Sequence, residues 1–323
     1  MSISYKIKRL LIISVAIIIL AIAANEGSNK IDNPISTHKR TPYPNIPADI
    51  DQNAIDSNME VKPKSSSTKA ISQSNPPLIS AEAYLVGNLE TGEIYAEHNI
   101  KKIFPIASLS KLITALIALH IMQSDQKITI TQSMLDGYGE AGHLVLGETL
   151  TVSELLYPLL LESSNDAAEA IAQSYGYDNF VKQMKAFTSE LNMTSTSFQD
   201  ASGLNSRNSS NSQDLFILSR YLYEKEKPLL EITRQIHITL ASTTEHGEHI
   251  FNTINPFPLD PHFIGGKTGR TNEAKESMIS LFRYFNGTMS YPVAIIVLRS
   301  DFKVREIDSS ILFEQFIKKI GIK

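Results

Sequence analysis

Apolar and polar residues are distributed unevenly along the 323-residue chain, and the first clear feature is an apolar run. The run extends from Leu10 to Ala24 with Ser14 as its one polar residue, behind the basic residues Lys6, Lys8 and Arg9. It is shorter than the roughly 20 residues that cross a bilayer comfortably, and a basic flank before a short apolar stretch is typical of a secretory signal. We expect residues 1–24 to be a signal peptide or a retained N-terminal membrane anchor. Either reading places the rest of the chain outside the cytoplasm, because the positive charge stays inside.

The next region changes sharply in composition. Residues 25–77 are rich in Asn, Ser, Pro, Lys and Asp, and their apolar residues are scattered. Such a segment buries too little apolar surface to offset its conformational entropy. We therefore interpret residues 25–77 as a disordered tether, and we expect one folded domain over residues 78–323.

Within that domain, helical periodicity occupies the middle and strand patterns stand on either side of it. The predicted strands are 83–88, 93–97, 263–267, 277–284 and 292–298. The predicted helices are 109–122, 154–161, 166–174, 179–191 and about 307–320. Strands at both ends with helices between them imply an α+β fold, in which the two parts of a sheet meet around an inserted helical region. A cleft between sheet and helices is the natural place for a site.

Composition narrows the class of protein further. A hydrophobic content of 42% is enough for a core, so a wholly disordered chain is excluded. The 30 basic and 34 acidic residues nearly balance, which argues against a nucleic-acid partner because such partners need a concentrated basic face. There is no cysteine, so disulfides, thiol nucleophiles and cysteine metal sites are excluded.

Three short motifs carry candidate chemistry. They are Ser108-Leu109-Ser110-Lys111, Ser163-Ser164-Asn165 and Lys267-Thr268-Gly269. The first pattern alone is weak, because Ser-x-x-Lys also occurs at Ser66 to Lys69 and at Ser124 to Lys127. Context separates them: Ser66 lies in the predicted tether and Ser124 precedes a polar stretch, whereas Ser108 stands at the start of a helix that is apolar nearly all round and therefore buried.

The first motif can turn an ordinary serine into a nucleophile. Positions i and i+3 share a helix face, so the Ser108 hydroxyl and the Lys111 amine can meet. Burial disfavours the charged ammonium and lowers the lysine pKa, and a neutral lysine can accept the serine proton without a histidine. The structural alternative is a capping serine beside a lysine whose stem is buried and whose amine reaches solvent.

The other two motifs can assist that chemistry. Ser163 and Asn165 stand between two predicted helices, where they can relay a proton to the leaving group and hold the substrate backbone. Helix capping is the structural alternative. Lys267 stands on a strand edge that a peptide could extend as an added strand, with its terminal carboxylate meeting Lys267 and Thr268. A tight turn with an exposed lysine is the alternative for this motif.

These motifs in this order resemble the D-alanyl-D-alanine carboxypeptidase family, the low-molecular-mass penicillin-binding proteins. The resemblance runs from about residue 81 to residue 299. It is carried by the segments Pro105–Thr114, Gly147–Val152, Glu162–Ala168, Ala201–Leu204 and Gly265–Thr271.

The resemblance implies a fold like that of the β-lactamases and penicillin-binding transpeptidases: an antiparallel sheet of about five strands with flanking helices and an inserted helical subdomain. It implies a serine peptidase that removes the terminal D-alanine of peptidoglycan stem peptides ending in D-Ala-D-Ala, without a metal or other cofactor. It also implies covalent inhibition by β-lactam antibiotics and a place in the bacterial cell envelope. Only 25 residues follow Leu298, so we expect any membrane attachment to come from the N-terminal segment.

Residue roles follow from the same resemblance. The catalytic residues that it implies are Ser108, Lys111, Ser163 and Asn165, and the substrate-binding residues are Lys267, Thr268, Gly269 and Arg270. Ser108 would carry the acyl group, Lys111 would act as its base, and Ser163 and Asn165 would assist. The backbone N–H groups of Ser108 and Arg270 would form the oxyanion hole.

Several alternatives stay open. A DD-endopeptidase that cuts peptidoglycan cross-links uses the same acylation chemistry. A non-catalytic cell-wall binding protein that has lost turnover is a further alternative, and the three intact motifs argue against it. A class A β-lactamase shares them too, but Thr188 stands where its deacylating glutamate would precede the Leu191-Asn192 pair. The segment His246-Gly247-Glu248-His249 matches no zinc-protease pattern, so we expect no metal site there.

Overall fold

The computed structural model of the protein describes residues 78–137 and 142–321. The predicted signal or anchor segment (1–24) and the predicted tether (25–77) lie outside these residues. In the described ranges, no helix combines the length and the hydrophobicity that crossing a bilayer requires.

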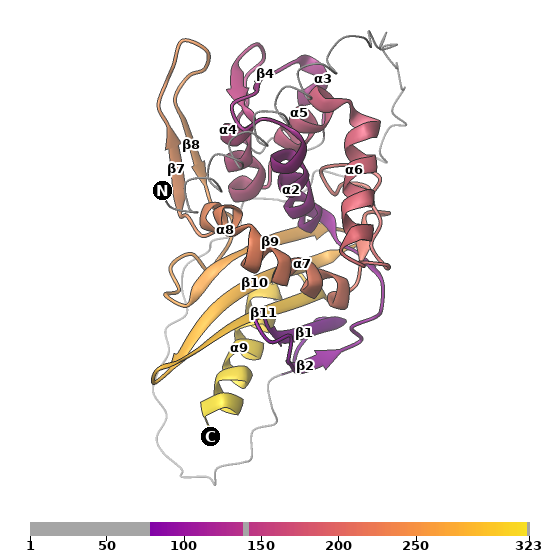
Figure 1. Cartoon of the computed structure of the whole chain (residues 1–323), viewed down its shortest axis with the longest axis vertical. Helices are drawn as coiled ribbons and strands as arrows, with labels where there is room; N and C mark the ends of the chain where they lie inside the picture. The colour runs from indigo at the N-terminus through magenta and orange to yellow at the C-terminus, as the bar shows by residue number, and fades with distance from the viewer. Residues whose placement is uncertain (1–77, 138–141, 322–323) are drawn as a thin grey trace, which may run out of the picture. The chain divides into compact units, whose positions relative to one another are not determined.

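A five-stranded antiparallel sheet forms one half of the domain, in the strand order β2-β1-β11-β10-β9 (Figure 1). Its strands are β1 (Ala83–Asn88), β2 (Ile94–His98), β9 (Phe263–Thr271), β10 (Lys275–Asn286) and β11 (Met289–Ser300). β1 pairs with β11, so that Ala83 lies opposite Leu298. The first hairpin therefore joins strands from the far end of the chain, and the predicted α+β fold with a five-stranded antiparallel sheet is confirmed.

Both faces of the central strand β11 are buried, which explains its continuous apolar sequence. Because successive side chains of a strand point to opposite faces, its residues divide between two apolar clusters. Alternate residues from Val293 to Val297 pack with helix α9 (Arg305–Gly321). The intervening residues from Ala294 to Leu298 join the main core with α2 (Lys111–Ile121) and α7 (Ser212–Lys225).

The inserted helical region forms the other half of the domain. Besides α2 it contains the 3₁₀ turn η1 (Ala107–Ser110), α3 (Gln132–Leu135), α4 (Val152–Tyr157), the π-helical turn η2 (Pro158–Glu162), α5 (Asn165–Tyr175) and α6 (Tyr177–Glu190). α2 lies at its centre and contacts α4, α5, α6 and η2. The first eight residues of α2 are all buried, as expected for a helix without a polar face.

Some predicted boundaries were wrong. The predicted helix 109–122 is divided, because the chain first makes the 3₁₀ turn η1 and the α-helix begins only at Lys111. The predicted helix 154–161 is observed as α4 followed by η2; Pro158 has no N–H to donate and interrupts the regular helix. The predicted strand 263–267 continues to Thr271, so the whole third motif lies within β9.

The sequence pattern predicts no element between residues 192 and 262, where the structure contains a short strand, two helices and a hairpin. These are β6 (Ser209–Ser210), which pairs with β3 (Phe104–Pro105), then α7, α8 (Lys227–Thr233), β7 (His237–Leu240) and β8 (His249–Asn252). A short pair of β4 (Lys127–Thr129) and β5 (Thr149–Thr151) completes the structure.

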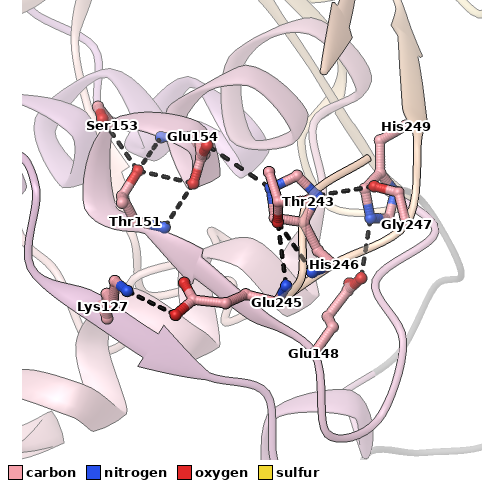
Figure 2. Close-up of polar contacts among 10 residues, drawn as sticks. All are labelled: Lys127, Glu148, Thr151, Ser153, Glu154, Thr243, Glu245, His246, Gly247 and His249. Carbon is pink, nitrogen blue, oxygen red and sulfur yellow. Dashed lines mark hydrogen bonds and ion pairs between the residues drawn. The ribbon is translucent and has the colours of Figure 1, made fainter. Parts of the chain in front are cut away.

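The β7–β8 hairpin packs beside the helical region through a set of polar contacts (Figure 2). His249 Nε2 lies 2.8 Å from Glu148 Oε2, and both side chains are almost completely buried. His246 Nε2 lies 3.7 Å from Glu154 Oε1 at the start of α4. The two histidines of the segment that matched no zinc-protease pattern thus face carboxylates of the helical region and join the hairpin to it.

Candidate active site

The candidate nucleophile lies in the 3₁₀ turn between β3 and α2. Ser108 is half-buried there, and Ala107 before it has a left-handed backbone with φ +48°. A 3₁₀ turn has three residues per turn, so residues three apart stand directly above one another. Lys111 Nζ accordingly donates to Ser108 Oγ at 3.0 Å.

Lys111 is completely buried, in contrast to the solvent-reaching lysine of the structural alternative. Besides Ser108, its Nζ contacts Asn165 Oδ1 at 2.7 Å and the Ser202 carbonyl oxygen at 2.5 Å. Burial lowers the pKa of Lys111 from 10.5 to about 7, while the negative charges of Asp200 and Glu169 act in the opposite direction. A substantial fraction of the amine is therefore neutral near neutral pH, as a general base requires.

The second motif divides its functions among neighbouring residues. Ser164 caps α5, because its Oγ accepts from the Ala167 backbone N–H at 3.1 Å. Asn165, the first residue of α5, directs its side-chain oxygen to Lys111. Ser163 ends η2 with a left-handed backbone, φ +63°, and is half-buried. The capping alternative therefore applies to Ser164 and leaves Ser163 and Asn165 for the site.

The third motif lies on β9, an edge strand of the sheet that packs against η1. Gly269 permits this close approach, since a Cβ at that position would lie 2.8 Å from the Ile106 carbonyl oxygen. Lys267 is buried within the strand, so the alternative of an exposed lysine in a turn is wrong. Thr268 is buried beside it, and Arg270 is exposed near the end of the strand.

Lys267 is held in a cationic environment. Its Nζ donates to the Thr268 carbonyl oxygen at 3.0 Å. Burial, and then the positive charges of Lys111 and Arg305, hold the pKa of Lys267 well below its usual value. An anionic group bound here would oppose all of these effects, so the site favours a carboxylate.

Two contributors to the site were missed by sequence reasoning. Arg305, in the first turn of α9, donates to the Gly269 carbonyl oxygen at 3.2 Å and adds its charge beside Lys267. The Ser202 carbonyl oxygen accepts a hydrogen bond from the Lys111 amine. Ser202 lies in a segment that carried the family resemblance. In contrast, α9 was predicted only from its amphipathic pattern, which gives no sign that Arg305 contacts the third motif.

The structure thus brings all three motifs together around Lys111 and β9, and it leaves the other candidates outside. Thr188, which occupies the position of a β-lactamase glutamate, is buried on α6 and donates to the Met184 carbonyl oxygen at 3.1 Å. His246 and His249 belong to the β7–β8 hairpin. Within the described residues, no group of three or more histidine, cysteine or acidic side chains is arranged to hold a metal ion.

The hairpin nevertheless reaches the second motif through the backbone. The Asn252 N–H donates to Glu162 Oε1 at 2.9 Å, and the Ile254 N–H donates to the Leu161 carbonyl oxygen at 3.1 Å. Leu161 and Glu162 end η2 immediately before Ser163. The base of the hairpin therefore fixes the turn from which Ser163 projects.

Comparison with known proteins agrees with this geometry. The family of the D-alanyl-D-alanine carboxypeptidases, Peptidase_S11, matches residues 69–297. A D-alanyl-D-alanine endopeptidase of Haemophilus influenzae is 33% identical over 215 residues, which cover 65% of this chain and 73% of the relative. The D-alanyl-D-alanine carboxypeptidase DacB2 of Mycobacterium tuberculosis is 31% identical over 206 residues, which cover 62% and 69%.

Solved structures show the same fold. Penicillin-binding protein D2 from Listeria monocytogenes, in its cefotaxime-bound form, superposes with a TM-score of 0.65 at 30% identity, covering 75% of this chain and 98% of that protein. The family match spans most of the chain and contains all three motifs in their order. This protein therefore belongs to the D-alanyl-D-alanine carboxypeptidase family.

Proposed function

We propose that this protein is a serine D-alanyl-D-alanine carboxypeptidase that removes the terminal D-alanine of peptidoglycan stem peptides through an acyl-enzyme on Ser108. The observation that carries the proposal is the buried Lys111 amine, 3.0 Å from the Ser108 hydroxyl and with its pKa lowered to about 7. The side chains of the three motifs can supply nucleophile, base and carboxylate-binding groups, so the proposed reaction uses no cofactor.

The reaction follows from these positions. Neutral Lys111 accepts the Ser108 proton while Oγ attacks the carbonyl carbon of the penultimate D-alanine. The N–H groups of Ser108 and Arg270 stabilise the oxyanion. The C–N bond to the terminal D-alanine then breaks, and the leaving amine receives a proton through Lys111 and Ser163. Water attacks the resulting ester and releases the shortened peptide, which restores Ser108.

Substrate binding uses the sheet edge and the buried cations. An extended peptide can pair with β9 as an additional strand, which aligns its C-terminus with the third motif. The terminal carboxylate then meets Lys267 and Thr268, with Arg305 adjacent. The negative charge of this carboxylate offsets the repulsion between Lys267 and Arg305 and favours the charged form of Lys267.

The family also suggests inhibitors and a location. The Listeria protein binds cefotaxime and ampicillin in its solved structures. We expect β-lactams to acylate Ser108 here in the same way as the substrate. We propose that residues 1–24 direct export or anchor the chain, that residues 25–77 form a tether, and that the peptidase domain of residues 78–323 acts in the cell envelope.

The test is D-alanine release from a peptide ending in D-Ala-D-Ala. We expect the purified protein to release D-alanine and Ser108→Ala to abolish that release. Ser124→Ala is the matched control, because Ser124 begins a second Ser-x-x-Lys pattern but is exposed on the surface. Persistent release by Ser108→Ala would show that another group is the nucleophile.

Endopeptidase activity is the second candidate, since the Haemophilus relative is named an endopeptidase. Both reactions acylate the same serine and differ in the leaving group. Digestion of purified muropeptides with mass readout separates them. A carboxypeptidase releases free D-alanine from monomers, whereas an endopeptidase converts cross-linked dimers into monomers.

A further inference from the structure

A buried carboxylate outside the three motifs organises one wall of the active site. Asp200 is 4% exposed and lies just before Ser202, whose carbonyl holds Lys111. Its Oδ1 accepts from the Gly203 backbone N–H at 2.5 Å, and its Oδ2 accepts from the Asn205 backbone N–H at 2.6 Å. The Asn208 side chain donates to Oδ1 at 3.0 Å. One carboxylate therefore folds residues 200–205 into a turn, and its partners in the described structure are N–H and O–H donors.

The turn that Asp200 folds presses against the nucleophile. Gly203 has φ +88°, and a Cβ at that position would lie 2.0 Å from the Ala107 carbonyl oxygen and 3.0 Å from the Ser108 nitrogen. The Ala201 carbonyl accepts from Thr114 Oγ1 of α2 at 2.6 Å. Asp200, through this turn, thus meets both the Ser108 turn and the helix that carries Lys111.

Asn208 connects Asp200 to the same place from the other side. Its Nδ2 donates to Ser110 Oγ at 3.2 Å, and Ser110 Oγ donates to the Ala107 carbonyl oxygen at 2.8 Å. The Ile106 backbone N–H donates to the Asn208 carbonyl oxygen at 3.0 Å. The 3₁₀ turn that presents Ser108 is therefore held by Ser110, Asn208 and Asp200, and of these three residues Asp200 carries the charge.

The charge of Asp200 also acts on Lys111. The charged groups that influence or surround the lysine amine are Asp200, Glu169 on α5 and Lys267 on β9. Both carboxylates favour the ammonium form of Lys111, and the charge of that ammonium in turn lowers the pKa of Lys267. Asp200 alone among them also fixes the backbone carbonyl to which the amine is bonded.

We propose that Asp200 is a positioning residue for acylation: its buried carboxylate folds the 200–205 turn, which holds the Ser202 carbonyl against the Lys111 amine and the Gly203 backbone against the Ser108 turn. The proposal rests on Lys111 acting as the base in the proposed function. It assigns Asp200 no contact with substrate. It follows that geometry and charge at this position have separable effects on acylation.

The experiment measures the second-order rate of acylation by a fluorescent penicillin against pH, in the full-length protein and its variants. Asp200→Asn keeps the shape of the side chain and removes its charge. It also places an amide N–H₂ donor opposite a backbone N–H donor that the carboxylate accepted from. We expect acylation to fall at least tenfold and the midpoint of its acidic limb to move to lower pH by about one unit, because a carboxylate that favoured the ammonium is gone. Asp200→Glu keeps the charge and displaces it, so we expect a similar loss of rate with an unchanged midpoint.

Asp214→Asn is the matched control. Asp214 is 5% exposed and likewise accepts from a backbone N–H and a hydroxyl, those of Ser195 and Thr196. Its side chain's hydrogen bonds within the described residues involve neither Lys111 nor the turn of residues 200–205. We expect its midpoint to equal that of the unaltered protein. The proposal would be overturned if Asp200→Asn changed neither the midpoint nor the rate of acylation. If Asp200→Asn does not fold, acylation of Asp200→Glu at the wild-type rate would overturn it instead.

The same data distinguish this failure from failure of the proposed function. If the unaltered protein shows no acidic limb near pH 7, or if Lys111→Ala is acylated normally, Lys111 is not the base and the proposal about Asp200 falls with it. If the limb is present and Asp200→Asn changes neither its midpoint nor the rate of acylation, only the proposal about Asp200 is wrong.

Discussion

The close contact between Gly203 and the Ser108 turn allows a sharp steric prediction, for the substitution Gly203→Ala. The added Cβ would lie 2.0 Å from the Ala107 carbonyl oxygen, which is about 1.5 Å inside an ordinary contact of roughly 3.5 Å. Both partners are backbone, so no side-chain rotation relieves the overlap. The left-handed backbone at φ +88° adds about 1 kcal/mol for any residue with a Cβ.

One of the two turns must therefore move by about 1 Å, and a displacement of that size at reacting groups costs roughly 100-fold in rate. Gly147→Ala is the control, because Gly147 has nearly the same backbone angle, φ +87°, and open space where the Cβ would be. Thermal unfolding and penicillin acylation are measured for both variants. We expect both to lose about 1 kcal/mol from backbone strain, and only Gly203→Ala to lose acylation and further stability. Equal losses in the two variants, with acylation intact, would refute the reasoning.

Three further predictions concern charged groups. The pKa of Lys111 is lowered to about 7, and the proposed base is the deprotonated amine. The rate of acylation should therefore rise as pH increases through about 7 and level off above it. A rate independent of pH from about 5 to about 9 would contradict this assignment. Lys267→Ala should raise KM for peptides with a free C-terminal carboxylate by at least about tenfold, and an amidated peptide, which lacks that charge, should show no such difference. His249→Ala removes the partner of buried Glu148 and should lower the free energy of unfolding by about 3 kcal/mol. The double variant with Glu148→Gln should recover part of that loss. Additive losses from the two single substitutions would argue against a coupled pair.

Local spacing made part of the site predictable. Ser108 and Lys111 are three residues apart at the start of an apolar helix, so the contact between their side chains follows from short-range geometry. The strands were predictable for a similar reason, because alternation and continuous apolar runs are properties of a few consecutive residues. The left-handed turn at Ser163 and the extension of β9 through the third motif were not, since both depend on packing against distant segments.

Contacts that join remote parts of the chain could not be read from the sequence. Lys111 meets Asn165 across 54 positions and Ser202 across 91. Arg305 reaches Gly269 only because α9 crosses the sheet at one particular place. The β7–β8 hairpin was missed because His249, Ile250, Phe251 and their neighbours alternate only over a very short stretch. These elements are specified by tertiary packing, which overrides weak local preference.

The pairing of β1 with β11 has a consequence for how the protein is made. The partners Ala83 and Leu298 are separated by nearly the whole domain, so the β1–β2 hairpin has no further strand to pair with until β11 has been synthesised. Contacts of such high sequence separation form slowly and late. Lys111 can approach Ser108 as soon as α2 forms, but Lys267 has no place until β9, β10 and β11 pair. A nascent chain therefore contains its proposed nucleophile long before the third motif is in place beside it, and any truncation that removes β11 leaves both halves of the sheet without a centre.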